Sequence, residues 1–571
     1  MTIQLKNEKE ILSHFRHPVF RPGQKEAILE CVDAFDNKGK QFVISELPTG
    51  VGKSDIAYTL ATHYCEGVTL SDEDIDYIAQ TGDSPYALDE INQVYVTTSQ
   101  KILQDQYLRD FKEDRGFFYD IRGATNYDCI NPRSEYETTC KENGKVCPHK
   151  GKMTCTYHAE KIFARTHPVT SLNNAYYYAV AGRWPSRELA VFDECHNLPD
   201  NILDIISFQL SDETLMKCAL IDHYFDESVI FKEGMPNPLP IKIDTIFQWT
   251  ESVLGPLAAH ATVLSEKEGA TTKEEDDFLD LIAETIEKIK RFLSSRGKTR
   301  WIGEVEFHKK GRIVRARPLD SGFFAKSSFF YQAERFALQS ATIVDPVRFA
   351  QDVGLSKDEF HYIEKPSPFP VQNRPVFFMD HVTLSKKAIE ENTPKLIEMI
   401  VKIVKAYPDQ KGIIHCHTYD LQEKIAKALD NGRIITHNRF NKSQALDQHV
   451  TSTAPTILLS PSMTEGVDLK GELARFCIIC KIPFLFRGDQ RVVEKIAQDP
   501  GWEGYQIAKT LIQSVGRGVR SETDWCHTYI LDKAFGSFIR NTRMPSDFVR
   551  AVKSRSDAQK LFSRKGYDNL I

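Results

Sequence analysis

The fold of this chain is decided by Glu46-Leu47-Pro48-Thr49-Gly50-Val51-Gly52-Lys53-Ser54. The apolar residues 41–45 before this stretch predict a buried strand, and residues 55–62 after it predict a helix. Gly50 and Gly52 allow backbone N–H groups to approach phosphate oxygens closely, and the start of a helix adds a partial positive charge. A strand, a glycine-containing turn and a helix are what a phosphate-binding loop requires.

The side chains of this loop have the chemistry to bind a nucleotide and its metal. Lys53 can reach the β- and γ-phosphates, and Ser54 can hold Mg²⁺. We expect the nucleotide to contact Pro48, Thr49, Gly50, Val51, Gly52, Lys53 and Ser54. The pattern G-x-x-x-x-G-K-[ST] has its first glycine where this chain has Leu47, so these nine residues alone also fit a chance Gly-Lys-Ser turn.

Length and composition indicate a soluble globular chain of several domains. The chain has 571 residues, of which 41% are hydrophobic and 27% charged. Its net charge of −6 does not indicate a nucleic-acid partner, so any such site must be a local basic groove. No apolar run is long enough to span a membrane, and the first residues have no apolar signal core. We therefore expect a protein that stays inside the cell, in the cytoplasm or with the chromosome.

An acidic pair follows a second predicted strand. Residues 188–192 are apolar enough for a buried strand, and Asp193-Glu194-Cys195-His196 comes directly after it. In a chain with a phosphate loop, Asp193 can hold Mg²⁺ through water, and Glu194 can orient or deprotonate the attacking water. The alternative is a polar turn at the end of a strand.

Three further segments are candidates for contact with the nucleotide or with a nucleic acid. Gln24 follows a Pro-Gly turn at a predicted helix start, where it is either structural or a reader of the adenine edge. Residues 94–98 predict a strand whose Thr-Thr-Ser end suits a phosphate backbone or an ordinary helix cap. Residues 338–343 predict a strand ending in a small hydroxyl loop near the acidic pair.

Four cysteines lie within a polar segment that could not bury a core unaided. Cys129, Cys140, Cys147 and Cys155 are separated by gaps of ten, six and seven residues. Zinc sites usually contain closely spaced cysteine pairs, which are absent here, whereas wide unequal gaps suit the corners of an iron–sulfur cluster. We rank a [4Fe–4S] cluster first, zinc second and four free buried thiols third.

The second half of the chain, from about residue 371, alternates strand and helix patterns and predicts another parallel sheet. The predicted strands are 412–415, 456–460, 476–480 and 528–531. Gln513, Arg517 and Arg520 are spaced to lie on one helical face. They can act on the phosphates bound by the first half, as arginine fingers do, or they can form a surface ion-pair face.

Between the two halves, residues 203–305 predict a helical insertion. Residues 273–294 carry apolar side chains with a helical period, and we expect this region to be helical rather than part of a sheet.

Together these motifs resemble those of the XPD/DinG group of superfamily 2, the iron–sulfur 5′→3′ DNA helicases. The resemblance covers residues 15–535 and rests on Gln24, 50–54, 193–196, 340–342, 367–370, 465–468, 513–520 and the four cysteines. It implies an α/β fold with two RecA-like parallel-sheet motor domains, and it adds Asp468 to the residues that bind the nucleotide. Leu47 fits the group, which often has an apolar residue there.

The resemblance also implies a domain plan. The predicted boundaries are 1–117, 161–202 and 309–365 for motor domain 1, 118–160 for the iron–sulfur domain, 203–308 for a helical Arch-like insertion and 366–571 for motor domain 2. The chain departs from the group in having Cys195 where alanine is usual, and in being shorter than typical members.

The implied function is an ATP- and Mg²⁺-dependent helicase in DNA repair, recombination or replication. Lys53, Asp193, Glu194, Gln513, Arg517 and Arg520 would be catalytic. We expect a monomer that binds single-stranded DNA, duplex junctions and RNA–DNA hybrids, and no membrane. The alternatives are a nucleic-acid-stimulated ATPase that remodels protein–DNA or R-loop complexes, a metal-dependent nuclease and a non-catalytic scaffold.

Overall fold

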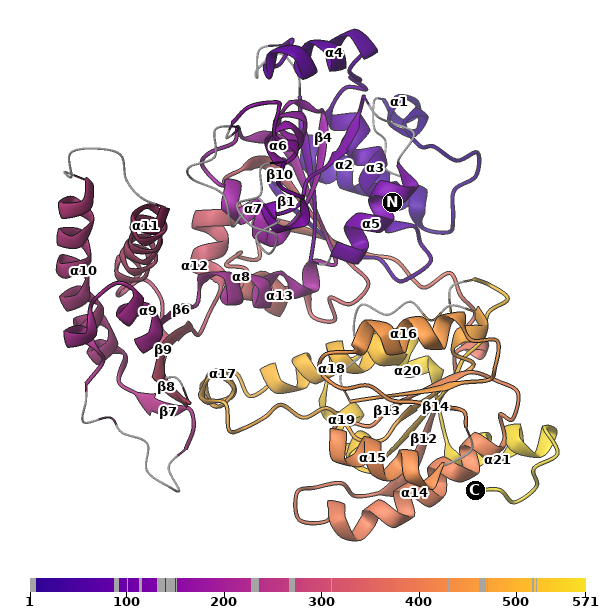
Figure 1. Ribbon diagram of the computed structural model, residues 1–571. Helices are drawn as coiled ribbons and strands as arrows, with labels where there is room; N and C mark the ends of the chain where they lie inside the picture. The colour runs from indigo at the N-terminus through magenta and orange to yellow at the C-terminus, as the bar shows by residue number, and fades with distance from the viewer. Residues whose placement is uncertain are drawn as a thin grey trace.

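The computed structural model consists of two parallel-sheet domains and a third, smaller lobe (Figure 1). It describes residues 7–86, 92–99, 101–111, 116–130, 139, 149, 151–226, 229, 236–265, 273–309, 311–429, 432–461, 469, 471–515, 518–519 and 521–571. Within these residues, no helix is both long and apolar enough to cross a bilayer.

The first domain, which keeps its predicted name of motor domain 1, is built on a seven-stranded sheet with the order β11-β1-β10-β5-β2-β4-β3, and every neighbouring pair is parallel. Its strands are β1 (Phe42–Glu46), β2 (Val94–Thr98), β3 (Phe118–Asp120), β4 (Val169–Asn173), β5 (Arg187–Asp193), β10 (Ala333–Ser340) and β11 (Phe360–Glu364). Both faces are covered, which explains why the central strands are nearly continuous apolar runs.

Helices cover the two faces of this sheet in separate layers. Residues of α1, α2 and α3 pack in one apolar cluster, and residues of α7, α8, α12 and α13 pack in the other. The helices of this domain are α1 (Glu8–Ser13), α2 (Gln24–Val32), α3 (Lys53–Tyr64), α4 (Asp72–Thr81), α5 (Lys101–Asp110), α6 (Thr156–Thr166), α7 (Asn174–Val180), α8 (Leu198–Ile206), α12 (Gly322–Phe324) and α13 (Pro346–Asp352).

Motor domain 2 repeats this plan with the order β14-β15-β13-β16-β17-β12-β18, again wholly parallel. Its strands are β12 (Val376–Val382), β13 (Gly412–His415), β14 (Ile434–Ile435), β15 (Ile457–Ser460), β16 (Phe476–Ile479), β17 (His527–Asp532) and β18 (Val552–Lys553). Its helices are α14 (Ile389–Lys405), α15 (Tyr419–Ala428), α16 (Lys442–Thr451), α17 (Gln490–Gln498), α18 (Trp502–Val515), α19 (Ala534–Asn541), α20 (Ser546–Ala551) and α21 (Arg555–Arg564). In Figure 1, α16 and α18 lie on the side that faces motor domain 1.

The third lobe corrects the expectation of a wholly helical insertion. It contains the long helices α10 (Ile243–Ser265) and α11 (Lys273–Ser294), and also the short helix α9 (Asp212–Lys217). These accompany an antiparallel sheet with the order β6-β9-β8-β7, formed by β6 (Phe208–Ser211), β7 (Leu239–Ile241), β8 (Trp301–His308) and β9 (Gly311–Pro318). Strands of three or four residues such as β6 and β7 are too short to give a recognisable period in the sequence.

Two segments lie in a different sheet from the one their predicted domain implied. Strand β9 was expected in motor domain 1, but it pairs with β6 and β8 in the insertion. Strand β3, at the start of the predicted iron–sulfur domain, pairs with β4 at the edge of the motor sheet. The other domain boundaries stay predictions.

Candidate active site

The phosphate loop follows β1 and leads into α3, as its sequence predicts. Gly50 and Gly52 both have left-handed backbones, with φ of +95° and +86°. A Cβ on Gly50 would lie 2.0 Å from the ring of Phe369, and one on Gly52 would lie 2.4 Å from Nε2 of Gln24. Both positions therefore require glycine for backbone conformation and for space.

The acidic pair lies at the carboxyl end of β5, two strands away from the phosphate loop in the sheet. The hydroxyl of Tyr107 and the backbone N–H of Glu194 donate to the Asp193 carboxylate at 3.1 and 3.0 Å. Glu194 has φ +50°, and its carboxylate lies 3.3 Å from Nζ of Lys53. The loop and the acidic pair thus form one site.

The two carboxylates have opposite electrostatic environments. Burial and the neighbouring Glu194 charge raise the pKa of Asp193 to about 6. Burial opposes ionisation of Glu194 as well, but Lys53 and His196 hold the pKa of Glu194 well below its usual value. Glu194 is therefore the carboxylate kept ionised, with one oxygen toward His196 and the other toward Lys53.

His196 connects this site to motor domain 2. Its Nδ1 lies 2.7 Å from the hydroxyl of Ser340 and 3.2 Å from Glu194. On the other side of the ring, Nε2 is in hydrogen-bond contact with the side-chain amide of Gln513 in α18, which also donates to Thr342 at 3.3 Å. A continuous polar chain therefore runs from Lys53 through Glu194 and His196 to the second domain.

A cavity of about 700 Å³ lies between the two motor domains and includes this site. Its wall from motor domain 1 includes Pro48, Thr49, Gly50, Gly52, Lys53, Ser54, Asp193 and Glu194. Its wall from motor domain 2 includes Arg374, Gln513, Val515, Val519, Asp547 and Arg550. This volume is within the range of small-molecule sites and the polar groups converge from both domains, so the cavity suits a nucleotide.

Some predicted residues lie beside the cavity rather than on its wall. Gln24 is buried, with its amide accepting from the Arg21 N–H at 3.0 Å and donating to the Gly52 carbonyl at 3.3 Å. Val51 is fully buried in the core below the loop. Gln24 therefore supports the loop's backbone, and its contact with adenine stays a prediction.

Other predicted residues lie outside the described part of the chain. These are Cys140, Cys147, Asp468, Arg517 and Arg520. Of the remaining cluster cysteines, Cys129 is partly exposed and Cys155 is buried, and both are free thiols. Within the described residues, no three His, Cys, Asp or Glu side chains are grouped for a metal ion.

Comparisons with known proteins agree with this architecture. A family model described as helicase C-terminal domain matches residues 400–554, and one described as type III restriction enzyme, res subunit, matches residues 17–232. The structure of Xpd4 from S. tokodaii has a TM-score of 0.55 at 13% identity, covering 93% of this chain and 99% of that one. An XPD helicase structure has a TM-score of 0.57 at 14% identity, covering 94% of this chain and 100% of the other.

Curated relatives are named as ATP-dependent DNA helicases. The ATP-dependent DNA helicase DinG of Photobacterium profundum is 24% identical over 280 residues, or 44% of this chain and 40% of that protein. The ATP-dependent DNA helicase YoaA of Haemophilus influenzae is 22% identical over 386 residues, or 60% of this chain and 59% of that protein.

The chain is similar in sequence and fold to the XPD/DinG-like helicases of superfamily 2. It spans less than two thirds of the length of each of these two curated relatives.

The structure of this XPD/DinG-like chain adds site residues that had no predicted role of their own. Phe369, within the 367–370 motif, packs its ring on Gly50. Tyr107 supports Asp193 from α5, and Arg374 lines the cavity from the start of motor domain 2. Lys509 in α18 donates to the His196 carbonyl at 3.4 Å. Of the other residues, only Lys509 could have been suspected from the sequence, because it lies one helical turn before Gln513.

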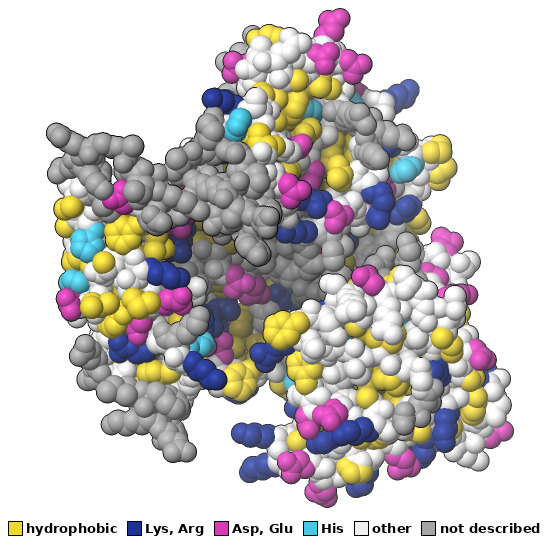
Figure 2. Space-filling model, viewed as in Figure 1, with side chains coloured by type: hydrophobic (Ala, Val, Ile, Leu, Met, Phe, Trp, Pro, Cys, Tyr) yellow, Lys and Arg dark blue, Asp and Glu magenta, His cyan; other side chains and the backbone are white. Residues whose placement is uncertain are grey.

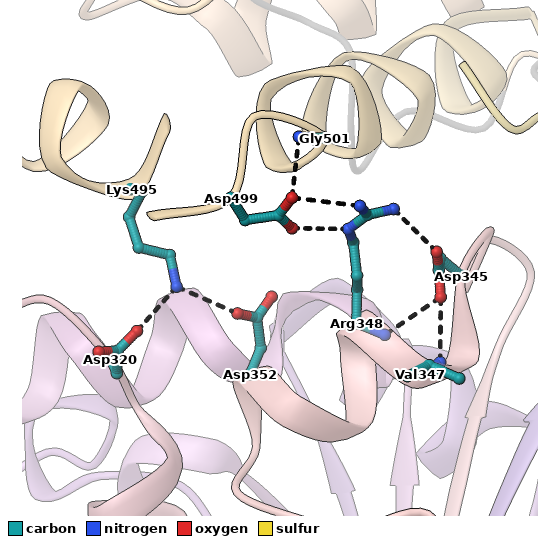
Figure 3. A network of polar contacts seen from close by, with 8 residues as sticks. All are labelled: Asp320, Asp345, Val347, Arg348, Asp352, Lys495, Asp499 and Gly501. Carbon is teal, nitrogen blue, oxygen red and sulfur yellow. Dashed lines mark hydrogen bonds and ion pairs between the residues drawn. The ribbon is translucent and has the colours of Figure 1, made fainter. Parts of the chain in front are cut away.

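Ion pairs join the two motor domains (Figure 3). Arg348 of α13 makes two contacts with Asp499, at 2.8 and 3.2 Å, and one with Asp345 at 3.0 Å. Lys495 of α17, which is 9% exposed, lies 2.8 Å from Asp320 and 3.4 Å from Asp352. The segment from α17 to α18 is thus anchored to motor domain 1 by charged groups.

Proposed function

We propose that this protein is an ATP-dependent DNA helicase that moves 5′→3′ along single-stranded DNA and unwinds duplexes. The observation that carries the proposal is the polar chain from Lys53 through Glu194 and His196 to Gln513. This chain of polar contacts connects the phosphate loop of motor domain 1 to helix α18 of motor domain 2. The polarity rests on the resemblance to the XPD/DinG group.

The residues present fit ATP and Mg²⁺. The left-handed glycines leave room for phosphate against the backbone, and Ser54 and Asp193 both line the cavity as oxygen ligands of the type that Mg²⁺ prefers. Bound Mg²⁺ supplies charge neutralisation for the phosphates. Lys53 neutralises the β- and γ-phosphates, and Glu194 accepts a hydrogen bond from the attacking water and takes its proton.

The Lys53–Glu194 ion pair makes the availability of the general base Glu194 depend on nucleotide binding. A γ-phosphate competes with Glu194 for Lys53, which frees the carboxylate to face the water. His196 then keeps Glu194 oriented through the contact between Nδ1 and Oε2. Because the other side of the His196 ring contacts Gln513, a shift of motor domain 2 changes the position of the general base.

We also propose the [4Fe–4S] cluster and the nucleic-acid partners. Asp128 and Thr139 form an antiparallel bridge, and they directly precede Cys129 and Cys140 in the sequence. The bridge pairs the residues that directly precede two of the four cysteines, and Cys129, Cys140, Cys147 and Cys155 would hold the cluster. The proposed substrates are single-stranded DNA and duplex junctions, with RNA–DNA hybrids as a further class, and the proposed active form is a monomer.

Unwinding of fluorescent duplexes with a 5′ or a 3′ single-stranded tail tests the proposal, with ATP and Mg²⁺ present. We expect unwinding of the 5′-tailed duplex only, and none with Lys53→Ala, which should still bind single strands. Unwinding of the 3′-tailed duplex alone would refute the polarity. DNA-stimulated ATP hydrolysis without unwinding of either duplex would favour a remodelling ATPase.

A further inference from the structure

Exposed aromatic side chains gather at one edge of motor domain 2. Seven aromatic residues are exposed among those that the structure describes: Tyr77, Phe323, Tyr331, Tyr419, Phe440, Phe484 and Phe486. The last four all follow the carboxyl ends of strands in the sheet of motor domain 2. Since these strands, β14, β13 and β16, lie within four consecutive positions of one parallel sheet, the aromatic side chains share one rim.

This rim is separate from the nucleotide cavity. The cavity residues Arg374, Val519 and Asp547 precede β12, β17 and β18, so they lie at the amino ends of their strands. The aromatic rim lies at the opposite ends of the strands, and the loop from β16 continues to α17 beside the insertion (Figure 1). Figure 2 shows hydrophobic side chains interspersed with Lys and Arg where motor domain 2 borders the hollow between the lobes.

Phe440 is the most exposed aromatic side chain of the rim, at 97%. Its loop is nevertheless held by a reciprocal set of hydrogen bonds. The Asn438 carboxamide oxygen accepts from the N–H groups of Phe440 and Asn441 at 2.8 and 3.2 Å, and Asn441 accepts from the Asn438 N–H at 2.7 Å. A phenyl ring held in water by a fixed turn has little conformational entropy to lose on binding.

Contacts between the loops make the rim continuous. The buried His437 bonds to the Ser460 hydroxyl at the end of β15, at 2.9 Å, and packs edge-on against the Tyr419 ring at 6.2 Å. Strand β13 pairs with β16 in parallel, with His415 opposite Ile479, so the loops that follow the two strands leave the sheet side by side. Phe440 is therefore one end of a surface that extends through Tyr419 toward Phe484.

The charge of the rim indicates an anionic partner. Arg439 is exposed beside Phe440, and Lys442 and Lys481 are partly exposed on the same rim. Aromatic side chains alternating with cations are what single-stranded nucleic acids bind, because each unpaired base offers a face for stacking and each phosphate a charge. A duplex cannot use such rings, since its bases are already stacked on one another.

We propose that Phe440 stacks on a base of the single strand that crosses motor domain 2, with Phe484 and Phe486 as further stacking contacts along the same rim. This inference rests on the proposed function. It adds that the protein binds the single strand through the faces of its bases as well as through its phosphates. The contact is sequence-tolerant because every base has a stacking face.

The test compares binding of two fluorescent oligomers of equal length, one of thymidine nucleotides and one abasic, by anisotropy without nucleotide. Phe440→Ala should weaken binding of the thymidine oligomer by about five- to a hundredfold and leave the abasic oligomer unchanged. Phe440→Trp should restore binding. Arg439→Ala should instead weaken the binding of both oligomers to the same extent. It should also lower the number of counterions released on binding, measured from the salt dependence of the affinity, by about one.

Tyr77→Ala is the matched control, because Tyr77 is an exposed aromatic residue on α4 of motor domain 1, 46% exposed. It should bind both oligomers as the unaltered protein does. Equal affinities for Phe440→Ala and the unaltered protein, or an equal loss for both oligomers, would overturn the stacking proposal alone. Failure of the unaltered protein to bind any single strand would overturn the proposed function as well.

Discussion

Lys509 of motor domain 2 donates to the backbone carbonyl of His196 in motor domain 1, while Gln513, one helical turn later, contacts the ring of the same histidine. Lys509 is 6% exposed, so its cation is buried at the interface. Its charge also acts on Asp352, which pairs with Lys495. Helix α18 therefore holds both the backbone and the side chain of the residue that orients Glu194.

Lys509→Met should lower kcat for ATP hydrolysis by about tenfold and leave KM nearly unchanged. A hydrogen bond from a charged donor contributes a free energy of this order, and the phosphate loop that determines nucleotide binding is untouched. Lys509→Arg should keep most of the rate. Steady-state ATPase assays measure both values.

Arg487→Ala controls for general loosening of α18, because Arg487 is exposed and pairs only at the surface with Glu503 of that helix. It should hydrolyse ATP at the unaltered rate. A normal kcat in Lys509→Met would contradict the positioning role.

Gly50→Ala should abolish ATP binding. The substitution combines a left-handed backbone with a Cβ that would overlap the Phe369 ring, so the loop, the ring or both must move. Titration with a fluorescent ATP analogue measures the loss. Gly39→Ala is the control, since Gly39 also has positive φ, at +60°, but open space around it. It should bind ATP normally, and unimpaired binding by Gly50→Ala would show that the loop tolerates displacement.

Arg348→Ala and Asp499→Ala should each increase the mean distance between the motor domains, and the double variant should add little to either. The reason is that both remove the same bidentate ion pair. Energy transfer between a dye on each domain reports the distance. Lys424→Ala, which breaks an exposed pair within α15, should leave it unchanged. Additive effects of the two substitutions would mean that the pair does not act as a unit.

Protein purified without oxygen should be brown and contain about four iron atoms and four sulfides per chain, as a [4Fe–4S] cluster requires. Cys129→Ser should lower the iron content, because a thiolate ligand is lost. Cys416→Ser is the control, since Cys416 is buried in motor domain 2. A colourless protein that contains zinc and remains active would refute the cluster.

The sequence predicted the central strands of both sheets because parallel strands buried on both faces are short apolar runs. Strands β2 and β13 have the predicted bounds, 94–98 and 412–415. The insertion sheet could not be predicted in the same way, because β6 and β7 are too short and the helical period of 273–294 dominates the region. These short strands are stabilised by antiparallel pairing with segments that are distant in the sequence, such as β6 with β9, and the local sequence pattern does not show that pairing.

The chemical residues were predictable where the reaction itself restricts the residue type. Lys53, Asp193 and Glu194 are such positions, and the structure brings them to one cavity. Phe369 and Lys509 act through packing and a backbone contact, for which many residue types would serve. Their partners are distant in the sequence, so only the fold reveals them.

The nucleotide cavity is built from the carboxyl ends of β1 and β5 in one sheet but from residues that precede β12, β17 and β18 in the other. The two domains therefore meet head to tail, and no two-fold axis relates their contributions. Two domains related by a two-fold axis would have no preferred direction along a bound polymer, because both ends of the polymer would contact the same surface. In this molecule the two ends differ, so the proposed cycle of cavity closure and opening would favour movement in one direction.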